Sequence, residues 1–171
     1  MNNILKTVIA LALASTAGLV HAQNNMDVVN GTKLPGIWDC TATLPVSASG
    51  STTVIKGRAN YNANGTVVHE DVVTKLTPGA APVSIKVLAF ADWKFVPASK
   101  LMYETTRKVS TTFDKTDSAA ALMGVSMDKS YQSAVDREQA TQVVRLDDNE
   151  WTTLAGDAKN PIAISCQRAK N

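Results

Sequence analysis

The stretch "GIWDC" (Gly36–Cys40) decides the fold, because its cysteine has one possible mate, the Cys166 of "ISCQR" near the far end of the chain. Residue numbers across an antiparallel strand pair sum to a constant. If Cys40 lies opposite Cys166, then Trp38 lies opposite Arg168 on the same face. A guanidinium over an indole ring is a favourable cation–π arrangement. One register therefore brings the cysteines together and gives the arginine a partner.

The first 22 residues, "MNNILKTVIALALASTAGLVHA", predict a secretory signal peptide. They carry one early lysine, then an apolar run, then small residues before Ala22, where cleavage is expected. The alternative is a membrane anchor, but the apolar run is shorter than the ~20 residues that span a bilayer. We therefore expect an exported protein, periplasmic or secreted.

An exported chain meets an oxidising compartment, so its two cysteines predict one disulfide, Cys40–Cys166. The other reading is a pair of free or metal-bound thiols. No histidine or third cysteine lies near either one in the sequence, which disfavours a metal site.

Removing 22 of 171 residues leaves 149, the size of one domain. We expect an arm at 23–35 and a barrel domain at 36–171. Lys6 leaves with the leader, so 16 basic and 15 acidic residues remain, spread without runs. This balance argues against nucleic acid or a membrane surface as a partner.

Short stretches rich in valine, isoleucine, threonine and aromatics alternate with turn residues and predict strands. In "VSIKVLAFADWKF" seven apolar residues recur at period two. A stretch without alternation, rich in alanine and methionine, predicts one helix, or two broken near Gly124. The expected strands are 36–45, 52–62, 66–76, 83–96, 100–112, 141–147, 150–155 and 161–168, with the helical insertion at 118–139.

If the first and last strands pair, the sheet has no free edge. The sequence therefore predicts an all-β fold, an eight-stranded up-and-down antiparallel β-barrel with a short helical insertion between strands five and six. A β-sandwich is the alternative that the same alternation allows.

These features resemble the lipocalin and avidin-like (calycin) superfamily: a Gly-x-Trp at Gly36–Trp38, an arginine in the last strand, a leader and about 150 mature residues. The resemblance implies that Trp38 and Arg168 close the bottom of the barrel and that the open end receives a small or apolar ligand. The family's usual helix follows the eighth strand, whereas here the helical stretch precedes the sixth. The position of the helical stretch favours a lipocalin-like bacterial protein over a true lipocalin.

Six residues are candidates for lining a ligand. Glu70 faces inward if Val68 and Val72 do, and Arg107 would then be its partner, either orienting a ligand or forming a structural pair. The aromatic candidates could equally be plain core. The candidate lining residues are Tyr61, Glu70, Trp93, Phe95, Tyr103 and Arg107.

No catalytic, metal-binding or cofactor-binding residues are predicted. After export the chain keeps one histidine, His69, which we interpret as a surface residue. The leading hypothesis is a monomeric, non-enzymatic barrel that binds a small apolar ligand in its interior. The alternative is a protein-binding module of the same fold, such as an inhibitor or immunity-type partner of another exported protein. A filled core would favour the second, and an open apolar cavity the first.

Overall fold

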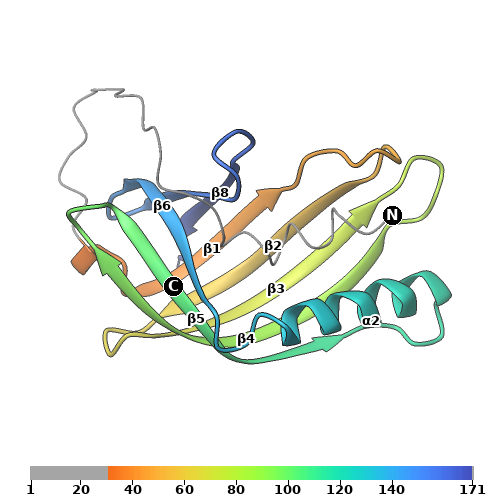
Figure 1. The fold of residues 1–171 in the computed structure, drawn as a ribbon, viewed down its shortest axis with the longest axis horizontal. Coiled ribbons are helices and arrows are strands. Elements are labelled where there is room, and N and C mark those ends of the chain that lie inside the picture. Colours follow the sequence, from red (N-terminus) through yellow and green to blue (C-terminus); the bar gives the residue numbers. More distant parts are fainter. Residues whose placement is uncertain (1–30, 171) are drawn as a thin grey trace.

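The computed structural model describes residues 31–170. The predicted leader at 1–22 and the arm residues 23–30 lie outside this range. The chain forms a closed barrel of eight antiparallel strands in sequential order (Figure 1). The elements are η1 (Gly31–Lys33), β1 (Gly36–Thr43), β2 (Thr52–Tyr61), β3 (Thr66–Leu76), β4 (Val83–Val96), β5 (Leu101–Thr112), α2 (Ser118–Gln132), β6 (Glu138–Leu146), β7 (Glu150–Ala155) and β8 (Ile162–Arg168).

The first and last strands close the barrel in the predicted register. Cys40 pairs with Cys166 and Trp38 with Arg168 across β1 and β8. The two sulfur atoms are bonded at 2.06 Å, so the disulfide staples the seam of the barrel. Pairing of every strand on both sides leaves no free edge, which excludes the sandwich.

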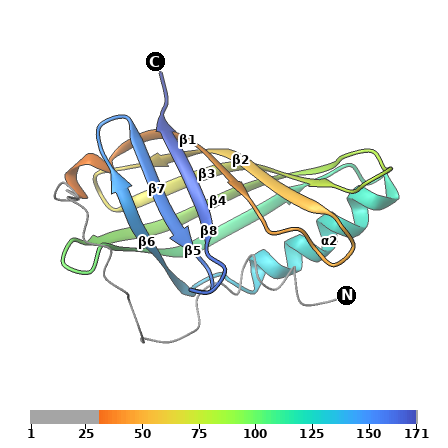
Figure 2. The same cartoon turned by 90° about the horizontal axis from the view of Figure 1, so that it is seen from above.

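The strands differ in length, and this divides the molecule into two ends. β4 has 14 residues whereas β7 has 6, so β2–β5 extend past the shorter strands (Figures 1 and 2). Helix α2 lies against this extension and packs on β4 and β5. Met127 of the helix joins a cluster formed by Val73, Ile85, Val87 and Val109. The helix therefore covers inner-face apolar residues that the short strands do not reach.

The opposite end of the barrel is filled by aromatic rings. Tyr61 packs edge-on against Trp93 and Trp151, with ring centroids 5.6 and 5.0 Å away. Trp151 in turn packs edge-on against Trp38 at 5.9 Å. Such perpendicular pairs add to the free energy of burial, by roughly 0.5–1.5 kcal/mol each. This end of the barrel is a packed core, and we call these four residues the aromatic floor.

The helical insertion is one helix, and it ends earlier than the sequence indicates. Asp117 caps its first turn by accepting hydrogen bonds from the backbone N–H groups of Ala119 and Ala120. The helix runs through Gly124 without a break and ends at Gln132. β6 then begins at Glu138, three residues before the predicted start, because Glu138–Thr141 pair with β5.

A β-bulge in β5 changes which residues face inward. The register with β4 shifts where Phe90 pairs with Lys108 but Ala91 pairs with Thr106, leaving Arg107 as the extra residue. Met102 and Val109 are both buried although their numbers differ in parity. Simple alternation therefore fails along this strand.

Candidate functional site

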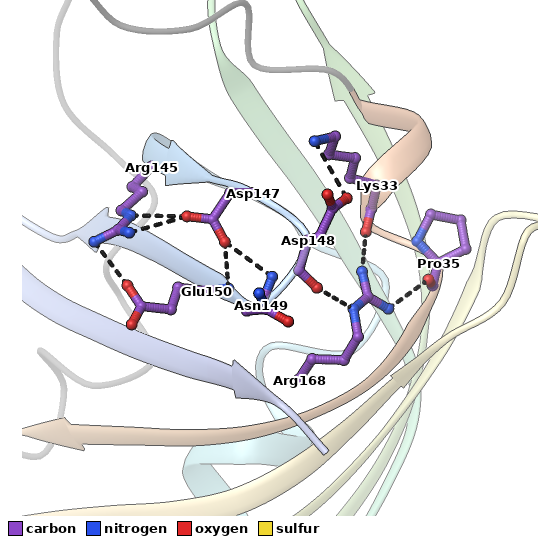
Figure 3. A network of polar contacts seen from close by, with 8 residues as sticks. All are labelled: Lys33, Pro35, Arg145, Asp147, Asp148, Asn149, Glu150 and Arg168. Atoms are coloured by element: carbon purple, nitrogen blue, oxygen red, sulfur yellow. Dashed lines mark hydrogen bonds and ion pairs between the residues drawn. The ribbon is translucent and has the colours of Figure 1, made fainter. Parts of the chain in front are cut away.

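Arg168 seals the bottom of the barrel through its stack on Trp38 and three backbone hydrogen bonds. Its guanidinium carbon lies 4.2 Å from the centre of the Trp38 ring. Its nitrogens donate to the carbonyl oxygens of Lys33, Pro35 and Asp148 at 2.7, 3.1 and 2.6 Å (Figure 3). Because the guanidinium donors are engaged in this way, Arg168 acts as a structural closure and offers little to a ligand.

The neighbouring turn between β6 and β7 is held by the same polar network (Figure 3). Asp147 accepts hydrogen bonds from the backbone N–H groups of Asn149 and Glu150 at 2.9 and 2.7 Å. Arg145 forms ion pairs with Asp147 and Glu150. These side chains are exposed, so the ion pairs contribute little to stability and serve mainly to shape the turn.

A cluster of ionisable side chains lies on the inner wall, next to the aromatic floor. His69 on β3 contacts Glu104 on β5, with 3.1 Å between Nε2 and Oε2. The hydroxyl of Tyr61 on β2 donates to the other carboxylate oxygen of Glu104. The side chains of His69 and Glu104 are 22% and 23% exposed. Water therefore reaches polar groups inside the barrel.

His69 and Glu104 stabilise each other's charged forms. Burial opposes the charge on His69, but the attraction and hydrogen bond of Glu104 outweigh it and raise the pKa of His69 to about 9. Burial likewise opposes the charge on Glu104, but His69 and the hydroxyl of Tyr61 lower the pKa of this carboxyl. At neutral pH the pair is an imidazolium and a carboxylate.

Asp71 adds a second carboxylate to the inner wall, two residues along β3 from His69. It pairs across the sheet with Gly57, where a Cβ atom would lie 1.8 Å from the Asp71 carboxylate oxygen. The missing side chain of Gly57 thus makes room for the carboxylate. Burial raises the pKa of Asp71, His69 lowers it and Glu104 raises it. Within residues 31–170 no side chain or backbone group donates a hydrogen bond to Asp71.

Two buried donors also lack a partner among the described residues. They are the indole N–H of Trp151 and the hydroxyl of Thr141. Trp151 belongs to the aromatic floor and contacts Tyr61. Thr141 pairs with the buried Met102 and so lies on the inner face of β6. Buried groups of this kind are uncommon in folded proteins and mark a place where a further hydrogen-bonding partner would be favourable.

The structure places three of the six candidate lining residues on the inner face. Tyr61 is 3% exposed and belongs to the ionisable cluster. Trp93 packs on Tyr61, and its indole N–H lies 3.1 Å from the carbonyl oxygens of Asn62 and Thr66. Phe95 packs against the buried aromatic core.

The other three candidates lie on the outer face, so the inward Glu70–Arg107 pair is wrong. Glu70 is exposed and lies beside Arg58 and Leu88. Arg107 forms ion pairs with Asp92 and Asp136 instead. Tyr103 pairs with Lys94, whose ammonium lies 4.8 Å from the centre of the Tyr103 ring.

The wrong orientation predicted for Glu70 and the wrong orientation predicted for Tyr103 and Arg107 each have a physical reason. In "VVHEDVV" each face of β3 begins and ends with a valine, so alternation does not decide which face is buried. The structure buries Val67 and Val73, which turns His69 and Asp71 inward and Glu70 outward. In β5 the bulge at Arg107 changes the parity. His69, which we interpreted as a surface residue, is consequently the centre of the interior cluster.

A hollow lies away from the interior cluster, where β1 and β8 meet the loop after β1. It measures about 460 Å³ and opens to solvent. Its lining includes Leu44, Pro45, Val46, Pro161 and Ile162. Val46 is 66% exposed, so this groove presents an apolar surface to water.

No protein-family model matches the chain, and no curated protein sequence matches it either. Across residues 31–170 no three histidine, cysteine, aspartate or glutamate side chains converge as metal ligands. No helix in the same range has the length and apolarity needed to cross a membrane. The interior cluster of Tyr61, His69, Asp71 and Glu104 is therefore the candidate site, on geometry alone.

Proposed function

We propose that this chain is an exported, non-enzymatic, lipocalin-like barrel that binds a small ligand in its interior. The observation that carries this proposal is the cluster of Tyr61, His69, Asp71 and Glu104, which faces inward and remains in contact with water. Ligand sites combine apolar walls with a few convergent polar groups. The aromatic floor and the apolar cluster under α2 lie on either side of this polar cluster. The ligand is therefore mainly apolar with one polar group.

Binding without chemistry fits the protonation of the cluster. A general base must be unprotonated near the working pH. His69, with a pKa of about 9, is protonated at pH 7 and already donates to Glu104. Both carboxylate oxygens of Glu104 are engaged by Tyr61 and His69. Neither residue is poised to abstract a proton.

Native mass spectrometry of the mature protein purified from its own host tests this function. We expect a retained small molecule of defined mass. Glu104→Gln should reduce its occupancy several-fold, because the charge holding His69 and Tyr61 in place is lost. Glu70→Gln is the matched control, since this carboxylate lies on the outer face of the same sheet, and it should leave occupancy unchanged. Wild-type protein that carries no small molecule would contradict the proposal.

The apolar groove at the β1–β8 seam favours a second candidate, a protein-binding module. Exposed residues of the loop after β1 line part of this groove. Because the groove is open and apolar, it suits contact with another exported protein better than enclosure of a small molecule. The same mass spectrum separates the two functions, because a retained polypeptide in place of a small molecule supports the second one.

A further inference from the structure

Three exposed apolar side chains lie together on the outer face of β3 and β4. Phe90 is 40% exposed, Val72 39% and Leu88 36%. Leu88 and Phe90 are two residues apart on β4, so they point to the same side of the sheet. Val72 pairs with Lys86, and it therefore lies diagonally across from Leu88. We call Val72, Leu88 and Phe90 the outer patch, and their exposure shows that no other part of the described chain covers them.

Lysines surround the outer patch on three neighbouring strands. Lys56 on β2 and Lys86 on β4 pair with Val72 from either side, and Lys108 on β5 pairs with Phe90. We call these three cations the rim lysines. The long apolar stem of a lysine can lie along a surface while its ammonium group reaches outward. This face of the barrel therefore has an apolar centre and a cationic rim.

The rim lysines have no counter-charge within residues 31–170, where no carboxylate lies within ion-pair distance of them. The carboxylate of Glu70 lies on the same face, but it is paired across the sheet with Arg58 and acts on that guanidinium. The other cations of this face are held in ion pairs: Arg58 with Asp39, Arg107 with Asp92 and Asp136, and Lys94 with Glu138. The near balance of charge in the whole sequence thus conceals unpaired positive charge around the outer patch.

We propose that the outer face of β3 and β4 docks on an anionic phospholipid surface. Apolar side chains ringed by cations match the interface of a bilayer, where acyl chains lie beneath negatively charged phosphates. Lysine is depleted in protein–protein interfaces, so three unpaired lysines fit a lipid surface better than an acidic protein. Leu88 and Phe90 contact the acyl boundary, and the rim lysines contact the phosphates. This face lies outside the barrel, so the proposal does not depend on a ligand in the interior.

Vesicle co-sedimentation of the mature protein tests the proposal. The probes are vesicles made of equal parts phosphatidylglycerol and phosphatidylcholine, and vesicles of phosphatidylcholine alone. At low salt we expect partitioning into the anionic vesicles to be at least about tenfold stronger, because each lysine near an anionic surface contributes roughly fivefold. High salt should remove most of this preference by screening. Equal partitioning of the wild-type protein into both kinds of vesicle would overturn the proposal.

Substitution of all three rim lysines by glutamine should lower partitioning into the anionic vesicles by at least about tenfold. The matched control substitutes glutamine for Lys129, Lys159 and Lys170, which are exposed on α2, in the loop before β8 and after β8. It removes the same net charge away from the outer patch and should change partitioning by less than about threefold. Equal losses in the two triple variants would make net charge the cause and overturn the proposal. Thermal unfolding of each variant confirms that it folds, and the wild-type comparison needs no variant.

Phe90→Ser tests the apolar centre of the face. We expect roughly fivefold weaker partitioning, because a partly exposed ring no longer enters the interface. Val46→Ser, at an exposed apolar residue of the loop after β1, is the matched control and should have no effect. Unchanged partitioning of Phe90→Ser would overturn contact with the acyl boundary. Binding to soluble polyglutamate but to neither kind of vesicle would assign the rim lysines to an acidic protein and also overturn the proposal.

Discussion

His69 shows how one residue's surroundings set its chemistry. Its ring lies between Glu104, which accepts its hydrogen bond, and Tyr61, whose ring packs edge-on at 5.9 Å. Three polar groups act on it: Tyr61 on β2, Asp71 on β3 and Glu104 on β5. The charge that Glu104 induces on His69 links the protonation of this ring to the stability of the fold.

We expect the free energy of unfolding to fall as the pH rises from about 6.5 to about 9. The folded pKa of His69 is raised from 6.5 to about 9, so its stabilisation is complete below pH 6.5 and lost as the pH passes through 9. A shift of this size corresponds to at most about 3 kcal/mol. Urea unfolding at a series of pH values measures it. The tyrosines ionise in the unfolded chain only near pH 10, above this window.

His69→Gln provides the control for this prediction. The variant should be less stable at pH 6, and its stability should be nearly constant between pH 6.5 and 9. An unchanged slope in the variant would assign the pH dependence to other groups. In acid the sign reverses: the lowered pKa of Glu104 contributes stability above its ordinary value of 4.5, and this is lost as the pH falls.

At the scale of elements, α2 is the part that departs from a simple barrel. The helix approaches β5 closely because Gly124 has no side chain where Phe113 packs. A Cβ atom there would lie 2.2 Å from two carbons of the phenyl ring. The glycine that suggests a helix break in the sequence is the residue that lets an unbroken helix dock.

Gly124→Ala should therefore destabilise the protein, although alanine is the better helix former by about 1 kcal/mol. The steric conflict with Phe113 requires the helix or the ring to move, and such overpacking costs roughly 1–3 kcal/mol. Ser126→Ala, at an exposed position of the same helix, is the matched control and should be neutral or slightly stabilising. Thermal unfolding of both variants checks this, and a Gly124→Ala protein more stable than wild type would show that the contact is not tight.

At the scale of the whole molecule, the barrel, the disulfide register and the helical insertion could be predicted, because each follows from short stretches with a clear pattern or from the two cysteines. The cysteines set the register of β1 and β8, and Asn64-Gly65 marks the turn from β2 to β3, where Gly65 has a φ of +85°. The site could be predicted only in part. Tyr61 alternates cleanly, but Asp71 and Glu104 do not stand out from the pattern of their strands.

The sequence did not show which face of β3 and which face of β5 point into the barrel. Register across the Asn64-Gly65 turn pairs Ala59 with His69 and Gly57 with Asp71. The inward face of β2 thus fixes the inward face of β3, whereas the valines of β3 alone do not. For Glu104 and Tyr103 no local pattern announces the bulge at Arg107, because it arises from pairing with β4.

Backbone pairing and a covalent link both join β1 to β8 at the closure of the barrel. Cys40 and Cys166 are 126 residues apart, so the bond closes a loop that contains nearly the whole domain and restricts the unfolded chain. Chain-entropy arguments give ~4–5 kcal/mol for a loop of this length, and removal of native disulfides typically costs 2–5 kcal/mol.

Cys40→Ala combined with Cys166→Ala should lower the free energy of unfolding by about 2–5 kcal/mol, measured by urea denaturation. Thr41→Ala with Ser165→Ala alters the adjacent, exposed register pair without touching the bond and should change stability by less than about 1 kcal/mol. Reduction of the wild-type protein should reproduce the effect of the double cysteine variant. If reduction left the unfolding midpoint unchanged, hydrogen bonding between β1 and β8 would suffice to hold the seam, and the bond would not be what keeps the interior site enclosed.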